Sequence, residues 1–145
     1  LSEDGSAEAG LARVTALLEE AGARPNGYDL FDGSGMSVYN RASPRTIVSL
    51  LTYAATQDWG EDWKATFPVG STDGSLTRRF RGTLLEGNIF AKTGTLKGTN
   101  ALSGYMVAAS GQTLVFAMIA NERPLAASSA APMMDAALVR IAEGN

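Results

Sequence analysis

The stretch NIFAKTGTLKGTNALSGYMVAASGQTLVFAMIAN, from Asn88 to Asn121, decides the fold. It contains three runs that we expect to form strands, over Asn88–Thr95, Ala101–Ala109 and Thr113–Asn121. Residues 110–112 form a connection between the last two runs that is short enough for an antiparallel hairpin. The sequence therefore predicts adjacent antiparallel strands in the second half of the chain.

Helical patterns lie before and after these strands. Apolar residues recur at helical spacing over Ala7–Ala21, and Gly22 is expected to end that helix. The segment Ser43–Ala55 begins with a serine suited to an N-cap and a proline suited to the first helical position. Ala130–Ala142 is the last predicted helix. Helices flanking an antiparallel sheet indicate an α+β layer architecture.

The segment that joins the second helix to the first strand has weaker patterns. Trp59–Ser75 is expected to be irregular, with a short helix around Trp63 and a turn at Asp73-Gly74. The spacing of the two tryptophans, Trp59 and Trp63, places both on one helical face. We interpret them as packing residues; stacking on a sugar ring is the alternative.

Composition excludes several kinds of chemistry. The 145 residues include no His and no Cys, so the chain holds no Ser-His-Asp triad, cysteine nucleophile or His- or Cys-ligated zinc site. Any general base must be Lys, Asp, Glu or Tyr. The net charge of −3 attracts neither nucleic acid nor an anionic membrane, and no apolar run approaches a membrane span. We expect no metal and no cofactor.

The tetrapeptide Lys92-Thr93-Gly94-Thr95 is the first candidate site. A lysine beside two hydroxyls and a glycine suits an anion site next to a reacting carbonyl. Lys92 supplies charge, Thr93 and Thr95 supply hydrogen bonds, and Gly94 lets a substrate backbone approach the strand. A solvated lysine followed by a turn is the alternative for the tetrapeptide alone.

The loop Asp32–Asn40 carries the second candidate set, Ser37 and Asn40. Taken alone, this loop is typical of Gly- and Ser-rich connections whose polar side chains satisfy local backbone groups.

Together, the two segments resemble a known family. DGSGMSVYNRASPRTIVSLL (Asp32–Leu51), STDGSLTRRFRGT (Ser71–Thr83) and AKTGTLKGTNALSGY (Ala91–Tyr105) resemble the class C low-molecular-mass penicillin-binding proteins. These are the D-alanyl-D-alanine carboxypeptidases and endopeptidases of the S13 peptidases. The resemblance implies the penicillin-recognising serine transferase fold shared with β-lactamases, an antiparallel sheet flanked by helices.

The motifs of that fold are S-x-x-K, S-x-N or S-D-N, and K-T-G. Ser37 and Asn40 are spaced one residue wider than S-x-N, and Tyr39 stands where the strict motif has Asn. No S-x-x-K exists, because the residues three positions before Lys64, Lys92 and Lys97 are Glu61, Ile89 and Gly94. We therefore expect residues 1–145 to be the C-terminal part of a catalytic domain whose nucleophile lies in a preceding segment.

The resemblance implies a role for each candidate residue. An upstream serine attacks the carbonyl between two D-Ala residues and forms an acyl-enzyme. Ser37 relays a proton to the leaving amine, and Asn40 binds the amide of the substrate. Lys92, Thr93 and Thr95 hold the terminal carboxylate beside Gly94, and the N–H of Thr95 forms half of the oxyanion hole.

The resemblance also implies partners and a compartment. Peptidoglycan peptides, β-lactams and the missing N-terminal segment are the expected partners, in the periplasm or another extracytoplasmic location. The turn Asp73–Ser75 is expected to be structural, and Arg78, Arg79 and Arg81 to form a solvated face. Two alternatives remain: an inactive peptidoglycan- or regulator-binding module on the same fold, and a β-lactamase or esterase relative.

Overall fold

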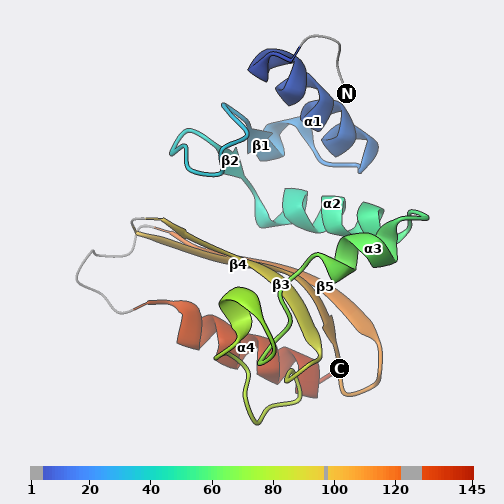
Figure 1. Cartoon of the computed structure of the whole chain (residues 1–145), viewed down its shortest axis with the longest axis vertical. Helices are drawn as coiled ribbons and strands as arrows, with labels where there is room; N and C mark the ends of the chain where they lie inside the picture. The colour runs from blue at the N-terminus through green and yellow to red at the C-terminus, as the bar shows by residue number, and fades with distance from the viewer. Residues whose placement is uncertain (1–4, 97, 122–128) are drawn as a thin grey trace.

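The computed structural model describes residues 5–96, 98–121 and 129–145. Within these ranges the chain forms two sheets and four α-helices (Figure 1). The helices are α1 (Ala7–Glu20), α2 (Pro44–Ala55), α3 (Gly60–Ala65) and α4 (Ala131–Glu143), with short 3-10 helices η1 (Pro25–Gly27) and η2 (Gly74–Leu76). The strands are β1 (Tyr28–Asp29), β2 (Arg41–Ala42), β3 (Ile89–Leu96), β4 (Thr99–Val107) and β5 (Thr113–Ala120).

The larger sheet is antiparallel in the order β3-β4-β5. Its register places Lys92 opposite Ser103, and Ser103 opposite Ala117. In Figure 1, α2 lies over one face of this sheet and α4 over the other. The predicted α+β architecture and the order of its elements are therefore confirmed.

The main core lies between this sheet and α4. Alternate residues of each strand point to this face because side chains alternate along a strand. Each large apolar side chain buried here contributes about 1.5–3 kcal/mol. The strand residues of this core are Ile89, Ala91, Leu102, Met106 and Phe116, and α4 supplies Met134, Leu138 and Ala142.

The other face of the sheet is tied to α2 by one buried hydroxyl. The Tyr105 hydroxyl in β4 donates to the carbonyl of Leu51 at 2.7 Å, and burial raises the pKa of this phenol. Edge-to-face contacts run from Tyr105 through Phe67 to Trp63, with centroid separations of 5.8 and 5.5 Å. Trp63 also contacts Trp59 edge to face, which confirms the predicted tryptophan packing. This face thus fixes the helical segment α2–α3 against the sheet.

Helix boundaries follow the predicted capping residues. The Ser43 hydroxyl accepts from the N–H of Thr46 at 3.2 Å, with Pro44 as the first residue of α2. α1 ends at Glu20, and Gly22 adopts a φ of 75°. The helices therefore begin and end within one or two residues of their predicted limits.

The strands differ slightly from their predicted limits. Pairing of β3 with β4 continues to Leu96 opposite Thr99, so β4 begins two residues before the predicted Ala101. Gly98, with a φ of 79°, permits the tight turn that this pairing requires. β1 lies in Gly27–Asn40, a stretch whose composition predicts loop or short strand, but β2 and its pairing with β1 were not predicted, because two-residue strands carry no periodicity. Lys97, which stands between β3 and β4 in the sequence, lies outside the described residues.

Gly104 generates a prediction about stability. A Cβ atom at this position of β4 would lie 2.0 Å from the carbonyl oxygen of Phe90 and 2.7 Å from the Cα of Ala91. Gly104→Ala must therefore push β3 away from β4, and we expect it to destabilise the fold by about 3 kcal/mol or more. Urea unfolding of both proteins measures this difference.

Gly10→Ala is the matched control. Gly10 lies within α1, and nothing lies within 4 Å of the Cβ that alanine would add. This change should stabilise the helix by up to about 1 kcal/mol. Equal unfolding midpoints for the Gly104 variant and the unchanged protein would show that β3 and β4 separate without cost.

Candidate functional site

Lys92 lies at the middle of β3 and has no acidic partner in the part of the chain that the structure describes. Its side chain shares a face of the strand with Phe90 and lies opposite the buried side chains of Ile89 and Ala91. Its ammonium Nζ donates to the carbonyl oxygen of Thr93 at 2.7 Å. Neither salt bridge found among the described residues involves Lys92. The ammonium is thus held at the strand with its charge not neutralised.

The outer edge of β3 is paired only along its first half. The N–H of Ala91 donates to the carbonyl of Pro68 at 3.0 Å, so the edge is covered there by segment 68–70. Backbone groups alternate in direction along an antiparallel strand, so those of Thr93 and Thr95 point to the same outer edge. In the described part of the chain, no backbone group pairs with the N–H of either threonine. The outer edge of β3 is therefore open for hydrogen bonding beyond Ala91, the last residue that pairs with segment 68–70.

Two hydroxyls meet beside this open edge. The Thr93 hydroxyl donates to Oγ of Ser75 at 2.9 Å. Ser75 belongs to η2 and was predicted to be purely structural, as part of the turn Asp73–Ser75. Its contact with the Lys-Thr-Gly strand was missed, although the resemblance already contained the stretch that carries it.

Asn100 fixes the far end of the tetrapeptide. Its amide nitrogen donates to the Thr95 hydroxyl at 3.5 Å, and its oxygen accepts from the N–H of Ala130 at 3.0 Å. Asn100 is buried in β4, directly opposite Thr95. Asn100 therefore links Thr95, at the end of the candidate site, to the start of α4. No sequence motif pointed to this role of Asn100.

Lys64 is a second cation near this strand. Its Nζ lies 4.7 Å from the centroid of the Phe90 ring, and Phe90 shares a strand face with Lys92 two residues away. Sequence reasoning placed Lys64 outside every motif and therefore overlooked this proximity. Lys64 contributes positive charge to the same face of the sheet.

Asn40 closes the loop that was predicted to carry the second motif. Its Oδ1 accepts from the N–H groups of Phe31 and Asp32 at 2.7 and 3.1 Å. Its Nδ2 donates to the carbonyl and the carboxylate of Asp32, both at 3.0 Å. These four bonds use both donors and both acceptor sites of the amide, so a substrate amide could bind it only by replacing one of them.

Asp32 is stabilised in its ionised form by the same loop. Hydrogen bonds from the Ser34 hydroxyl, then from the Ser34 N–H, and less strongly from Asn40 hold the pKa of Asp32 below its ordinary value. This contribution is present above the unfolded pKa of about 3.9 and is lost as pH falls through the lower folded pKa. The ionised carboxylate of Asp32 therefore contributes to the stability of this loop at neutral pH and loses that contribution in acid.

Ser37 and Asn40 are not brought into contact with the Lys92 strand. The Ser37 hydroxyl accepts from the N–H of Tyr39 at 3.2 Å, within its own loop. No hydrogen bond joins the described residues of this loop to β3, and Figure 1 shows the β1–β2 loop apart from that strand. The predicted catalytic set is thus present as two separate groups, and the second-motif roles stay predictions.

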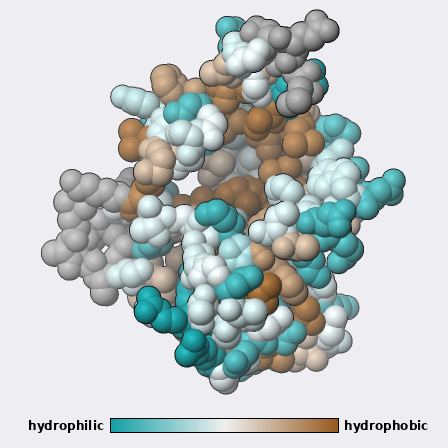
Figure 2. Space-filling view, viewed as in Figure 1, coloured by the Kyte–Doolittle hydropathy of each residue, from teal (hydrophilic) through white to brown (hydrophobic). Residues whose placement is uncertain are grey.

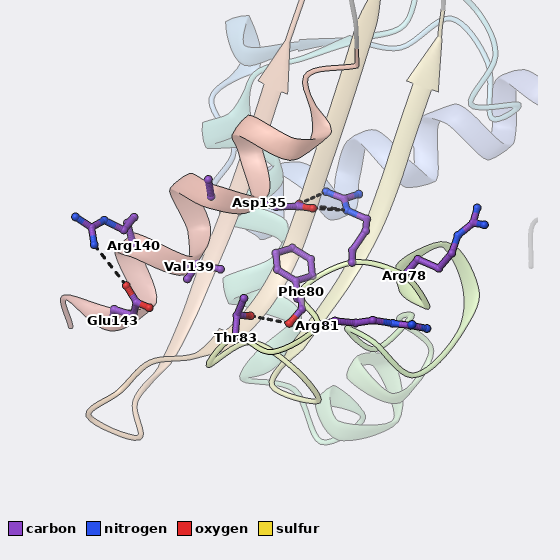
Figure 3. A pocket seen from close by; sticks show the side chains of 10 residues that line it. Arg78, Phe80, Arg81, Thr83, Asp135, Val139, Arg140 and Glu143 are labelled. Carbon is purple, nitrogen blue, oxygen red and sulfur yellow. Dashed lines mark hydrogen bonds and ion pairs between the residues drawn. The ribbon is translucent and has the colours of Figure 1, made fainter.

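An arginine-lined cavity of about 550 Å³ lies on the opposite, α4 side of the sheet (Figure 3). Arg79 there forms an ion pair with Asp135 of α4, with Nε to Oδ2 at 3.0 Å. The predicted solvated arginine face is therefore wrong for Arg79, which is half-buried because it ties the segment after η2 to α4. Arg78 and Arg81 are exposed.

No helix in the described ranges is long and apolar enough to cross a membrane.

Comparison with known proteins places this arrangement in a family. The model of the D-Ala-D-Ala carboxypeptidase 3 (S13) family matches residues 1–144. The D-alanyl-D-alanine carboxypeptidase of Actinomadura sp. (strain R39) is 40% identical over 146 residues, which cover 96% of this chain and 26% of that protein. DacB of Haemophilus influenzae is 35% identical over 120 residues, or 80% of this chain and 25% of the relative. The chain spans about a quarter of the length of these relatives.

Solved structures share its fold. Penicillin binding protein 4 (dacB) from Haemophilus influenzae, complexed with a β-lactam, matches with a TM-score of 0.82 at 30% identity, over 95% of this chain and 34% of that one. The predatory endopeptidase Bd0816 of Bdellovibrio bacteriovorus matches with a TM-score of 0.74 at 23% identity, over 95% and 37% of the two chains. These matches confirm the predicted fold and the resemblance from which it was inferred.

The network around Asn40 generates a second prediction. Asn40→Ala should release the N–H groups of Phe31 and Asp32, because both donate to the side-chain oxygen that this change removes. We expect their amide hydrogens to exchange about tenfold faster, which corresponds to about 1.4 kcal/mol of local stability. Hydrogen exchange followed by NMR gives the two rates.

Ser37→Ala is the control for this measurement. It removes only the acceptor for the N–H of Tyr39 and should leave the amides of Phe31 and Asp32 protected. If Asn40→Ala leaves the exchange of these two amides unchanged, the loop is held by other contacts.

Proposed function

The chain belongs to the D-Ala-D-Ala carboxypeptidase 3 (S13) family, and we propose that it supplies the Lys-Thr-Gly wall of a serine D-Ala-D-Ala carboxypeptidase active site. The observation that carries this proposal is the open edge of β3. There the unneutralised ammonium of Lys92 lies next to the outward N–H groups of Thr93 and Thr95. Such an edge suits an extended peptide that ends in a carboxylate, because it offers both positive charge and backbone donors.

The proposed chemistry needs a nucleophile from outside this chain. A serine with a neighbouring lysine attacks the carbonyl between two D-Ala residues, and water later hydrolyses the acyl-enzyme. The outward N–H of Thr95 is suited to the developing oxyanion, and one such donor is typically worth about 3 kcal/mol. Gly94 leaves its face of the strand open because it has no side chain. A Cβ atom at this position would lie 3.3 Å from the Cβ of Ala101.

Asn40 and Ser37 have different parts in this proposal. The Asn40 amide is occupied by Phe31 and Asp32, so we propose that it holds the loop and does not bind the substrate directly. Ser37 keeps the proposed role of proton relay to the leaving amine. Its hydroxyl accepts one bond from Tyr39, which leaves its own proton available.

The rest of the active site is proposed to come from a longer protein. The chain has no S-x-x-K motif and spans about a quarter of its relatives. Figure 2 shows hydrophobic residues gathered between α2 and the sheet on the viewed face, as expected for a surface that further chain covers. The proposed setting is extracytoplasmic, with peptidoglycan stem peptides as substrates and β-lactams as acylating inhibitors.

Separating this chain from its proposed N-terminal segment tests the division of the site. The isolated chain should give no covalent band with a fluorescent penicillin, and the longer protein should give one. The longer protein should also unfold at a higher temperature, because β5 has a strand partner on one side only among the described residues. Denaturing gels and calorimetry measure the two effects.

Labelling of the isolated chain would place a nucleophile within residues 1–145. Equal unfolding midpoints would show that the chain is complete as a folding unit. The sequence upstream of Leu1 provides a further check, since an inactive binding module on this fold would lack S-x-x-K there.

Lys92 gives the sharpest test of the site in the longer protein. Lys92→Ala should lower the second-order rate of acylation by penicillin about a hundredfold or more, equivalent to about 2.7 kcal/mol of transition-state stabilisation. Lys92→Arg should be intermediate, because it keeps the charge but its planar group cannot occupy the same point. Rapid-mixing kinetics measures each rate, with circular dichroism as a check on folding.

The control variant must remove a cation far from β3. Arg13→Ala serves this purpose because Arg13 is an exposed residue of α1. Lys64→Ala is unsuitable because Lys64 lies over Phe90, on the same strand face as Lys92. If a folded Lys92→Ala protein is acylated by penicillin at the same rate as the unchanged protein, the assignment of Lys92-Thr93-Gly94 to the active site is wrong.

A further inference from the structure

We infer that Ser75 is a direct hydroxyl ligand of the carboxylate that the β3 edge binds, with Thr93 behind it as the residue that orients it. This inference rests on the proposed function. It assigns a specific contact to a residue that lies outside the Lys-Thr-Gly tetrapeptide.

The direction of one hydrogen bond carries the assignment. The Thr93 hydroxyl donates its proton to Oγ of Ser75 at 2.9 Å. Each hydroxyl has a single proton, so that of Thr93 is used within the pair. The proton of Ser75 has no acceptor among the described residues, and its side chain is exposed. The free donor of the pair therefore belongs to Ser75.

The turn that carries Ser75 is fixed to the same strand. Leu76, the next residue, is completely buried in the core. The carboxylate of Asp73 accepts from the N–H of Val69 at 2.7 Å, which joins the turn to segment 68–70. That segment pairs with β3 through the carbonyl of Pro68. Segment 68–70 therefore holds both the turn of Ser75 and the first half of β3, and it fixes the position of Ser75 relative to the open half of the strand edge.

The local charges favour an anion at this place. The ammonium of Lys92 reaches the carbonyl of Thr93, the residue whose hydroxyl contacts Ser75. Asp73 is the acidic neighbour in the turn, and its Oδ1 is directed at the N–H of Val69. A carboxylate near Ser75 therefore meets a positive charge and a hydroxyl donor beside the open edge of the strand.

Accepting a hydrogen bond also makes Ser75 a better donor. Hydrogen bonds in a chain polarise one another, so the bond from Thr93 strengthens the one that Ser75 donates. Hydrogen bonds to charged groups contribute more than neutral ones. Loss of the Ser75 hydroxyl should therefore cost more than loss of the Thr93 hydroxyl, which acts through it.

The test compares two substrates in the protein that carries this chain together with its nucleophile. One peptide ends in D-Ala-D-Ala with a free carboxylate, and the other is its C-terminal amide. Ser75→Ala should lower kcat/KM for the acid about tenfold to hundredfold and leave kcat/KM for the amide within about twofold. Ser75→Thr should restore the preference for the acid because it keeps the hydroxyl.

Three further variants make the result specific. Ser75→Cys is nearly isosteric with a weak donor and should lose most of the preference, which keeps the test available if Ser75→Ala fails to fold. Thr93→Val should reduce the preference less than Ser75→Ala. Thr77→Ala is the matched control, because the Thr77 hydroxyl bonds to the carbonyl of Gly74 in the same turn at 2.8 Å. It should leave both rates unchanged.

The outcomes separate this inference from the proposed function. An unchanged ratio of acid to amide in Ser75→Ala and Ser75→Cys would overturn the inference, as would an equal loss for both peptides. If the unchanged protein and Lys92→Ala cleave the acid peptide equally, the proposed function itself fails. A larger loss in Thr93→Val than in Ser75→Ala would assign the carboxylate to Thr93.

Discussion

The antiparallel pairing of β3 is the constraint on which the rest of the structure depends. β4 covers its inner edge over the whole length, and Gly104 permits this close approach to the backbone of Phe90 and Ala91. Segment 68–70 covers the outer edge only as far as Ala91. The strict alternation of a β-strand then leaves the N–H groups of Thr93 and Thr95 pointing outward. The place and direction of the free donors follow from this pairing alone.

Charge is distributed so that the edge stays positive. The acidic residue of the nearby turn, Asp73, is directed at a backbone N–H, and Asp135 is paired with Arg79 on the other side of the sheet. Lys92 and Lys64 share the remaining face without a carboxylate partner among the described residues. In a chain without histidine, positive charge at neutral pH comes from lysine and arginine, and these two lysines supply it on this face of the sheet.

The fold was largely predictable because its elements have strong periodic patterns and clear caps. The Lys-Thr-Gly strand, the hairpin after it and the helix that begins at Pro44 needed only local information. The missed features are contacts between residues that are distant in sequence. Ser75 meets Thr93 across 18 positions, and Asn100 meets Ala130 across 30. Asn40 was recognised as important, but its four bonds within the loop were not visible in a motif.

The two outer edges of the main sheet differ in a way that separates their functions. The edge of β3 is partly covered by segment 68–70 and carries the charged side chain of Lys92, and both features discourage pairing with other sheets. β5 runs from Thr113 to Ala120 with no charged residue and no proline. An apolar edge of this length invites further strands. The two edges of the sheet therefore fit the two proposals made above, a peptide ligand at β3 and further chain at β5.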